Sequence, residues 1–160
     1  MYRARLFATR HSRAYERFYS LVEPIILFLM KWLSKLSGGR LDAPMTWMES
    51  KAKGLLFDCK MCGNCVLSST GMTCPMNCPK TIRNGPCGGV RANGHCEVKP
   101  EMKCVWVQAW DGASRMRGSD KIHEVQFAVD VSQKGSSAWL RMLQEREAHA
   151  KALAANKEAV

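Results

Sequence analysis

Apolar residues recur at helical spacing in one stretch near the start of the chain. Of the 16 residues from Leu21 to Leu36, 11 are apolar, and the spacing predicts a helix over residues 13–36 that ends at Gly38-Gly39. The residues close to one face of this helix are Leu21, Ile25, Phe28, Trp32 and Leu36. Because about 20 apolar residues are needed to span a bilayer, we expect this face to contact another protein or, as second choice, a membrane interface.

Weaker helical patterns follow on either side of an irregular centre. Proline suits the first turn of a helix, so helices are expected to begin near Pro44 and at Pro100. The first of them is expected to carry Trp47, Met48 and Leu55 toward Phe57. In the second, the residues expected to point inward are Cys104, Val105, Val107 and Trp110.

The last third of the chain is expected to contain an irregular segment and one helix. Glycines interrupt residues 112–135, and Ser136 or Ser137 can cap a helix after them. In that helix Trp139, Leu143 and Leu153 form a weak stripe before an alanine-rich tail.

Residues 71–104 are rich in Pro, Gly and Cys and show neither helical period nor alternation. A segment that buries so little apolar surface needs cross-links to stay folded. We therefore predict a small, mostly α protein with irregular, metal-stapled loops, its cysteine-rich core flanked by an N-terminal apolar helix and a C-terminal helix. The predicted divisions are a basic arm and apolar helix (1–43), a cysteine-rich metal-binding core (44–111), and an extended segment with the C-terminal helix (112–160).

All eight cysteines of the 160 residues lie in one short stretch, which points to metal ligation. They are Cys59, Cys62, Cys65, Cys74, Cys78, Cys87, Cys96 and Cys104. Eight soft sulfur ligands are the number that two four-coordinate centres require. Three cysteines at C-x2-C-x2-C spacing suit a cubane iron–sulfur cluster better than a zinc ribbon, which uses separated C-x2-C pairs. We expect two [4Fe-4S] clusters, with two Zn2+ ions as the alternative.

Disulfides are the other use of so many cysteines. The chain shows no secretory signal, since its apolar run contains Glu23 and Pro24 and no small-residue cleavage site follows. Thiols stay reduced in the cytosol, so a cytoplasmic location and metal ligation are expected together.

The net charge of +10 bears on both the metal and the partners. Between Cys59 and Cys104 the chain has an excess of four positive charges, including Lys80 and Arg83. This excess offsets two tetrathiolate centres, each of which would carry two negative charges, because cations stabilise thiolates. The basic residues before residue 41 could contact nucleic acid, anionic lipid or an acidic protein. A zinc-dependent nucleic-acid-binding module is only a remote alternative, because no zinc-finger or zinc-knuckle spacing is present.

A glycine-containing stretch surrounds Cys87 and supplies further candidate residues around a cofactor. In Asn84-Gly-Pro-Cys87-Gly88-Gly89, backbone amides can approach a cluster closely because glycine adds no side chain. Asn84, Gly88 and Gly89 join Lys80 and Arg83 as candidate cofactor-contacting residues, although turn chemistry explains the glycines equally well. No catalytic residue is expected in this chain.

Several segments together resemble the methylenetetrahydrofolate reductase C-terminal-like family, the small cysteine-rich partner subunits of two-subunit bacterial reductases. They are Leu55-Leu-Phe-Asp-Cys59-Lys-Met-Cys-Gly-Asn-Cys65, Cys74-Pro-Met-Asn-Cys-Pro-Lys80, Arg83-Asn-Gly-Pro-Cys-Gly-Gly89 and Cys96-Glu-Val. The similarity covers roughly residues 50 to 140. It implies a flavin-containing catalytic partner, holding FAD or FMN, that converts methylenetetrahydrofolate to methyltetrahydrofolate, and two four-iron clusters in this chain.

The function expected from these observations is electron transfer to or from that flavin subunit in one-carbon metabolism. Clusters ligated only by cysteine have no open coordination position, so chemistry on the substrate is not expected here. A purely structural subunit, stapled by zinc or by clusters, is the alternative. The helix around residues 25–36 and exposed tryptophans are the expected contact surface, and peripheral membrane contact through residues 21–36 competes with it.

Overall fold

The computed structural model describes residues 2–37 and 42–158 and is mostly helical within them, as predicted. Five α-helices occur in the described residues: α1 (Tyr2–Arg10), α2 (Ser12–Ser37), α3 (Asp42–Phe57), α4 (Val105–Ala113) and α5 (Ala138–Glu158). Three short 3-10 helices interrupt the loops: η1 (Pro75–Asn77), η2 (Ser119–His123) and η3 (Val131–Gln133). The predicted helix end at Gly38-Gly39 lies outside the described residues.

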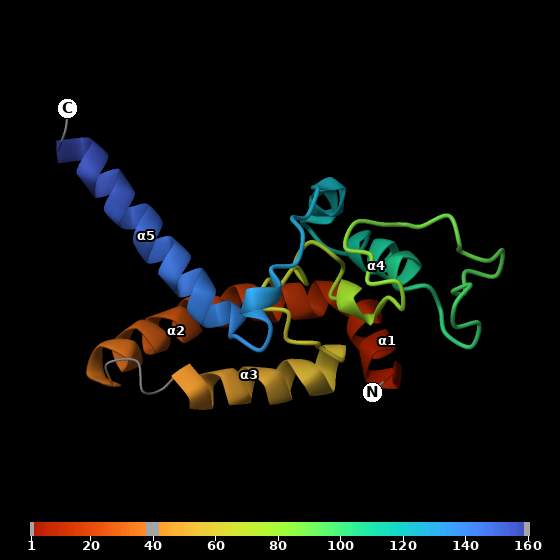
Figure 1. Cartoon of the computed structure of the whole chain (residues 1–160), viewed down its shortest axis with the longest axis horizontal. Coiled ribbons are helices and arrows are strands. Elements are labelled where there is room, and N and C mark those ends of the chain that lie inside the picture. Colours follow the sequence, from red (N-terminus) through yellow and green to blue (C-terminus); the bar gives the residue numbers. More distant parts are fainter. Residues whose placement is uncertain (1, 38–41, 159–160) are drawn as a thin grey trace.

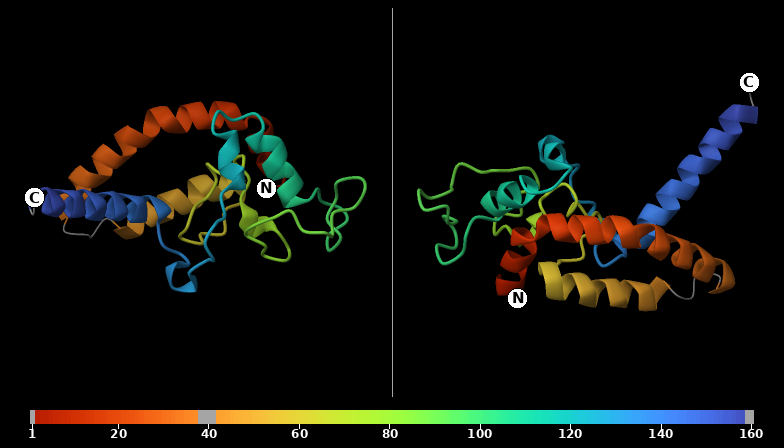
Figure 2. Two further views of the ribbon diagram at one scale, coloured as in Figure 1. Left: turned by 90° about the horizontal axis from the view of Figure 1, so that it is seen from above. Right: turned by 180° about the vertical axis from the view of Figure 1, so that it is seen from behind.

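Helices α1, α3 and α4 pack against the cysteine loops. Figure 1 shows α5 starting beside α2 and extending at an angle away from the rest of the molecule. The loops between η1 and α4 lie at the opposite end of the molecule from the tip of α5 (Figures 1 and 2). Within the described residues, none of the helices combines the length and apolar character needed to cross a bilayer.

Three small apolar clusters hold this arrangement together. The first joins α1 and the end of α3 to the cysteine loops through Ala8, Phe57, Leu67, Met72, Cys74 and Met116. The second joins α2 to α5 through Leu27, Met30 and Leu143. The third consists of Cys104, Trp106 and Ala109 at the start of α4. Because each cluster contains few residues, stability depends on the contacts among the loops as well.

The start of the predicted basic arm forms helix α1, an element that the sequence pattern did not indicate. Arg5 is buried, with its guanidinium 5.0 Å from the centre of the Tyr2 ring. Thr9 contributes a 2.8 Å hydrogen bond between its hydroxyl and that of Thr73 in the cysteine loops. The segment is therefore part of the packed structure and not a solvated extension.

The inward faces of α3 and α4 also differ from the prediction. In α3 the buried residues are Glu49, Lys53 and Phe57, whereas Trp47, Met48 and Leu55 are exposed. Helix α4 begins at Val105, five residues after Pro100, and buries Val105, Trp106 and Ala109 while Val107 and Trp110 stay at the surface. Trp106 packs with Cys104 and Ala109, and its indole N–H is satisfied by donation to the carbonyl of Ile82 at 3.0 Å.

A close backbone approach between Gly71 and Gly112 fixes α4 against the cysteine loops. A Cβ on Gly112 would overlap the Gly71 carbonyl, and Gly71 has φ +59°. The Gly112 carbonyl also accepts a 2.7 Å hydrogen bond from Ser12 Oγ at the start of α2. One glycine pair thus joins three segments of the chain.

Gly112→Ala is expected to lower the free energy of unfolding by about 1–3 kcal/mol, because the backbone must shift to admit a methyl group. Urea denaturation followed by circular dichroism measures the change. Gly54→Ala is the matched control: it lies inside α3 with nothing within 4 Å of the added Cβ, and alanine is the better helix former. Equal stability of Gly112→Ala and the parent chain would contradict the close approach.

Candidate metal centre

The loop that carries the first three cysteines is wound tightly by residues with left-handed backbone. Asp58 and Met61 have φ of 52° and 45°, and Gly63 has φ 75°. The Met61 amide donates to Cys59 Sγ at 3.3 Å, and the Met61 carbonyl accepts from the Gly135 amide at 2.7 Å. The first contact is an amide-to-sulfur hydrogen bond of the kind that tunes thiolate ligands.

Four cysteines distant in sequence by up to 15 positions line one small cavity: Cys59, Cys62, Cys65 and Cys74. The cavity also receives Lys53 from α3 and Arg83 from the following loop. All eight cysteines of the chain are free thiols. No three Cys, His, Asp or Glu side chains of the described residues are close enough together to hold a metal ion as they stand, so ligation requires the thiols to turn toward the cavity.

The thiols of Cys59 and Cys74 interact directly. The hydrogen bond from the Cys74 thiol lowers the pKa of Cys59 to about 6. The same bond, together with burial, raises the pKa of Cys74. The lowered pKa favours the Cys59 thiolate, and thiolates are the form in which cysteine binds metals.

Arg83 contributes a buried positive charge to this cavity. Its Nη2 donates to the Asn64 carbonyl at 2.7 Å, which ties it to the cysteine loop. Its Nε and Nη1 are buried and find no hydrogen-bond partner among the described residues. Unpaired buried guanidinium groups are costly, and a dianionic tetrathiolate centre in the adjacent cavity would satisfy them. The donor set and the charge therefore fit a thiolate-bound metal centre.

Lys53 supplies a second buried cation, held by Glu49 one helical turn earlier. Its ammonium forms an ion pair with Glu49 and lies 4.9 Å from the centre of the Trp139 ring. Burial alone would lower the pKa of Lys53, but the neighbouring Cys65 and Glu49 outweigh it and hold this pKa above its ordinary value. Lys53 therefore stays charged beside the cysteines.

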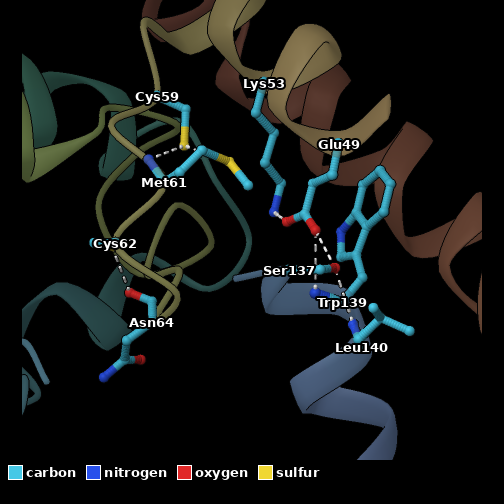
Figure 3. Close-up of polar contacts among 9 residues, drawn as sticks. All are labelled: Glu49, Lys53, Cys59, Met61, Cys62, Asn64, Ser137, Trp139 and Leu140. Atoms are coloured by element: carbon cyan, nitrogen blue, oxygen red, sulfur yellow. Dashed lines mark hydrogen bonds and ion pairs between the residues drawn. The ribbon is translucent and has the colours of Figure 1, made fainter. Parts of the chain in front are cut away.

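The same Glu49 carboxylate connects the cavity to the start of α5 (Figure 3). Ser137 Oγ donates to Glu49, and the Trp139 amide donates to Glu49 Oε2 at 3.5 Å. Ser137 Oγ in turn accepts from the Leu140 amide at 3.2 Å, which confirms Ser137 as the N-cap. A carboxylate and a capping serine satisfy amides that a helix start leaves unpaired.

The other four cysteines lie in the loops between η1 and α4. Cys78, Cys96 and Cys104 are buried and Cys87 is partly buried. Antiparallel bridges join Val90 to Cys96 and His95 to Lys103. The Cys96 amide donates to the Met102 carbonyl at 3.0 Å, and the Cys104 amide to the Gly94 carbonyl at 2.9 Å. These contacts bring Cys96 and Cys104 into one folded loop.

The remaining predicted cofactor-contacting residues lie apart from the cavity. Lys80 is exposed and paired with Glu97, and Gly89 leaves room for the same Glu97 side chain. Asn84 binds the backbone of Gln126 through both its donor and its acceptor, while nothing lies within 4 Å of a Cβ on Gly88. Among the five, Arg83 alone lines the cavity.

Lys53 and Glu49 are the charged cavity residues that the sequence pattern did not indicate. Their i,i+4 spacing on a helix normally indicates an exposed ion pair. The sequence did contain one indication of their burial. Glu49 and Lys53 precede Phe57 by eight and four residues, so the three share one face of α3, which is not the face that carries Trp47 and Leu55. Following that spacing would have identified the buried face of α3.

A family model described as methylene-tetrahydrofolate reductase C terminal matches residues 39–132. This stretch contains all eight cysteines, Lys53 and Arg83, whereas α1, α2 and α5 lie outside it. No curated protein and no solved structure gives a significant match.

Proposed function

Because the chain belongs to the methylene-tetrahydrofolate reductase C-terminal family, we propose that it is the accessory metal-binding subunit of a methylenetetrahydrofolate reductase complex. Its partner would be the flavin-containing catalytic subunit. The observation that carries the proposal is the cavity where four cysteines meet two buried cations, one of them with unpaired N–H groups.

We assign the cysteines to two centres on this basis. Cys59, Cys62, Cys65 and Cys74 would hold the first, since they line one cavity. The second would take the remaining four, Cys78, Cys87, Cys96 and Cys104, which share the loops before α4. Iron–sulfur clusters held in this way exchange single electrons, which suits a subunit that serves a flavin enzyme.

The residues around the first centre have distinct parts in the proposal. Arg83 and Lys53 would compensate the negative charge of the tetrathiolate and thereby favour its reduced form. Met61 and Gly63 would keep the loop closed against residues 133–136, since a Cβ on Gly63 would overlap Gln133 and Ser136. Water would be excluded by Val66 and Leu67, which line the same cavity and are buried.

One observation supports the structural alternative, in which each centre is a zinc ion. The cavity measures only about 20 Å³, close to the space of a single water molecule. A zinc ion fits a space of this size once the thiols turn toward it, whereas a four-iron cluster also requires the cysteine loop to move outward. A zinc-bound subunit would stabilise the reductase without transferring electrons.

The metal content of the purified chain decides between an iron–sulfur subunit that transfers electrons and a zinc-bound structural subunit. Protein purified without oxygen is expected to contain about eight irons and about eight sulfides per chain, the sum for two four-iron clusters. About two zinc ions in a colourless protein would instead favour the structural role. Where iron is present, electron paramagnetic resonance of the complex with its flavin subunit tests electron transfer. Clusters that stay oxidised while methylenetetrahydrofolate is turned over would leave a structural subunit.

A further inference from the structure

Helix α2 carries a continuous apolar row on its outer side. The row consists of Phe18, Leu21, Ile25, Phe28 and Trp32, each between 58% and 72% exposed. Their spacing alternates between three and four residues, as in the a and d positions of a coiled coil. At 100° per residue the row covers about 80° of the helix circumference, and the adjacent Leu29, 48% exposed, widens the apolar strip to about 100°. The alternating spacing of the row is that of a helix–helix seam, which favours a partner helix over a lipid surface.

The inner side of α2 is already occupied. Leu27 and Met30 are buried against Leu143 of α5, so the α2 row is a second apolar face that the fold does not use. Figure 2 shows α2 along the outside of the molecule, with no other element of the chain beyond it. Contiguous exposed apolar surface of this kind marks interaction sites.

The charges along α2 are sorted between its two sides. Its carboxylates, Glu16 and Glu23, are engaged inside the fold: Glu16 accepts from the Arg117 and Gly118 amides, and Glu23 pairs with Arg146. Beside the α2 row lie the exposed cations Arg13, Arg17 and Lys31. The outer face of α2 is therefore apolar at its centre and positive along its border.

The apolar centre and positive border of the α2 row favour one kind of binding partner. A second copy of the chain would place the same cations against each other, and like charges across an interface oppose binding. A helix with apolar residues in its seam and carboxylates along its border would complement both features. Occupancy by such a helix would also shield aromatic side chains that are otherwise left in water.

We propose that the α2 row docks an acid-bordered amphipathic helix of the flavin-containing reductase subunit. The inference rests on the proposed function for the identity of the partner, while the surface itself is independent of the metal. Helix α2 lies outside the family-matched residues 39–132, so this contact does not follow from the family match.

Binding of the full, metal-loaded chain to the purified reductase subunit of the same organism tests the proposal by sedimentation and by titration. Ile25→Asp and Phe28→Asp are each expected to weaken binding about tenfold or more, since they place a charge in the centre of the seam. Arg17→Glu is expected to slow association and to reduce its dependence on salt. Phe127→Asp is the matched control, because Phe127 is 87% exposed in an irregular segment and should bind as the parent does.

Metal content and thermal unfolding of each variant verify that the fold is kept, and Ile25→Gln gives a milder change at the same position.

If the parent chain binds the reductase but the α2 variants bind equally well, the docking surface is wrong and the proposed function stands. If the parent chain does not bind the reductase at all, the proposed function fails with it. Self-association of the parent chain that Ile25→Asp abolishes would assign the row to a second copy. Binding of the assembled complex to phosphatidylglycerol-containing vesicles, lost in Phe28→Asp, would assign it to a membrane.

Discussion

Cys74→Ser is expected to abolish one metal centre and to halve the metal content of the chain. Cys74 is buried in the cluster that joins α1, α3 and the cysteine loops, and it shares a cavity with the three cysteines of the C-x2-C-x2-C run. Structural metal centres contribute about 10–16 kcal/mol of apparent binding energy that also serves folding. We therefore expect loss of cooperative unfolding around α3 as well, measured by calorimetry beside metal analysis.

Paired substitutions test which cysteines share a centre. Cys59→Ser with Cys74→Ser should lose no more metal than either alone, because both remove the same centre. Cys74→Ser with Cys104→Ser should lose all of it. Lys60→Ala is the control within the same loop, since its ion pair with Asp58 is exposed and contributes little. Full metal content in Cys74→Ser would overturn the assignment of Cys59 and Cys74 to one metal centre. So would additive losses of metal in the double variant of Cys59 and Cys74.

Glu49→Ala is expected to destabilise the chain by about 3–5 kcal/mol, the usual effect of leaving a buried charge without its partner. The carboxylate is 1% exposed and bonds both Lys53 and the start of α5. Its loss should release α5, so limited proteolysis is expected to cut between residues 134 and 145 well before the parent chain is cut. Thermal unfolding gives the stability change.

A double variant separates the two roles of Glu49. Lys53→Met removes the buried cation, so Glu49→Ala with Lys53→Met should recover part of the stability while α5 remains easily cleaved. Glu145→Ala removes a surface carboxylate that pairs with Arg141 and should leave both measurements unchanged. Parent-like proteolysis of Glu49→Ala would show that α5 is held by its apolar contacts alone.

The pattern of apolar residues located most helices but not the faces they bury. Helices near residues 13–36 and 44–57, the irregular segment before the last helix and the Ser137 cap were confirmed. Helix α1 was missed because nine residues with three arginines have no strong stripe, and short helices depend on tertiary contacts. Its contacts include the Lys103 amide, which donates to the Tyr2 hydroxyl at 3.0 Å. No local pattern contains a partner 101 residues away.

Some residues of the candidate site could be predicted from the sequence, and others could not. Cysteine spacing and the family resemblance identified the eight thiols, and the family was confirmed; the metal and its distribution stay predictions. Arg83 was selected for its charge, but its burial depends on the Asn64 carbonyl, which a sequence does not place. Lys53 and Glu49 were missed because their burial follows from Ser137, 88 residues after Glu49.

The hydrogen bonds that hold α1 and α2 have a consequence for how the chain is made. Ser12, Glu16 and Glu23 bond to residues 100 to 123 positions later. At the rates of protein synthesis, about 5–20 residues per second, those partners leave the ribosome many seconds after the helices. Throughout that time the inner apolar face of α2 is unprotected as well as the outer row. The pairing that covers the inner face spans most of the chain, which slows folding. The N-terminal helices are thus synthesised first and docked last, so chaperone binding during translation should concentrate on α2.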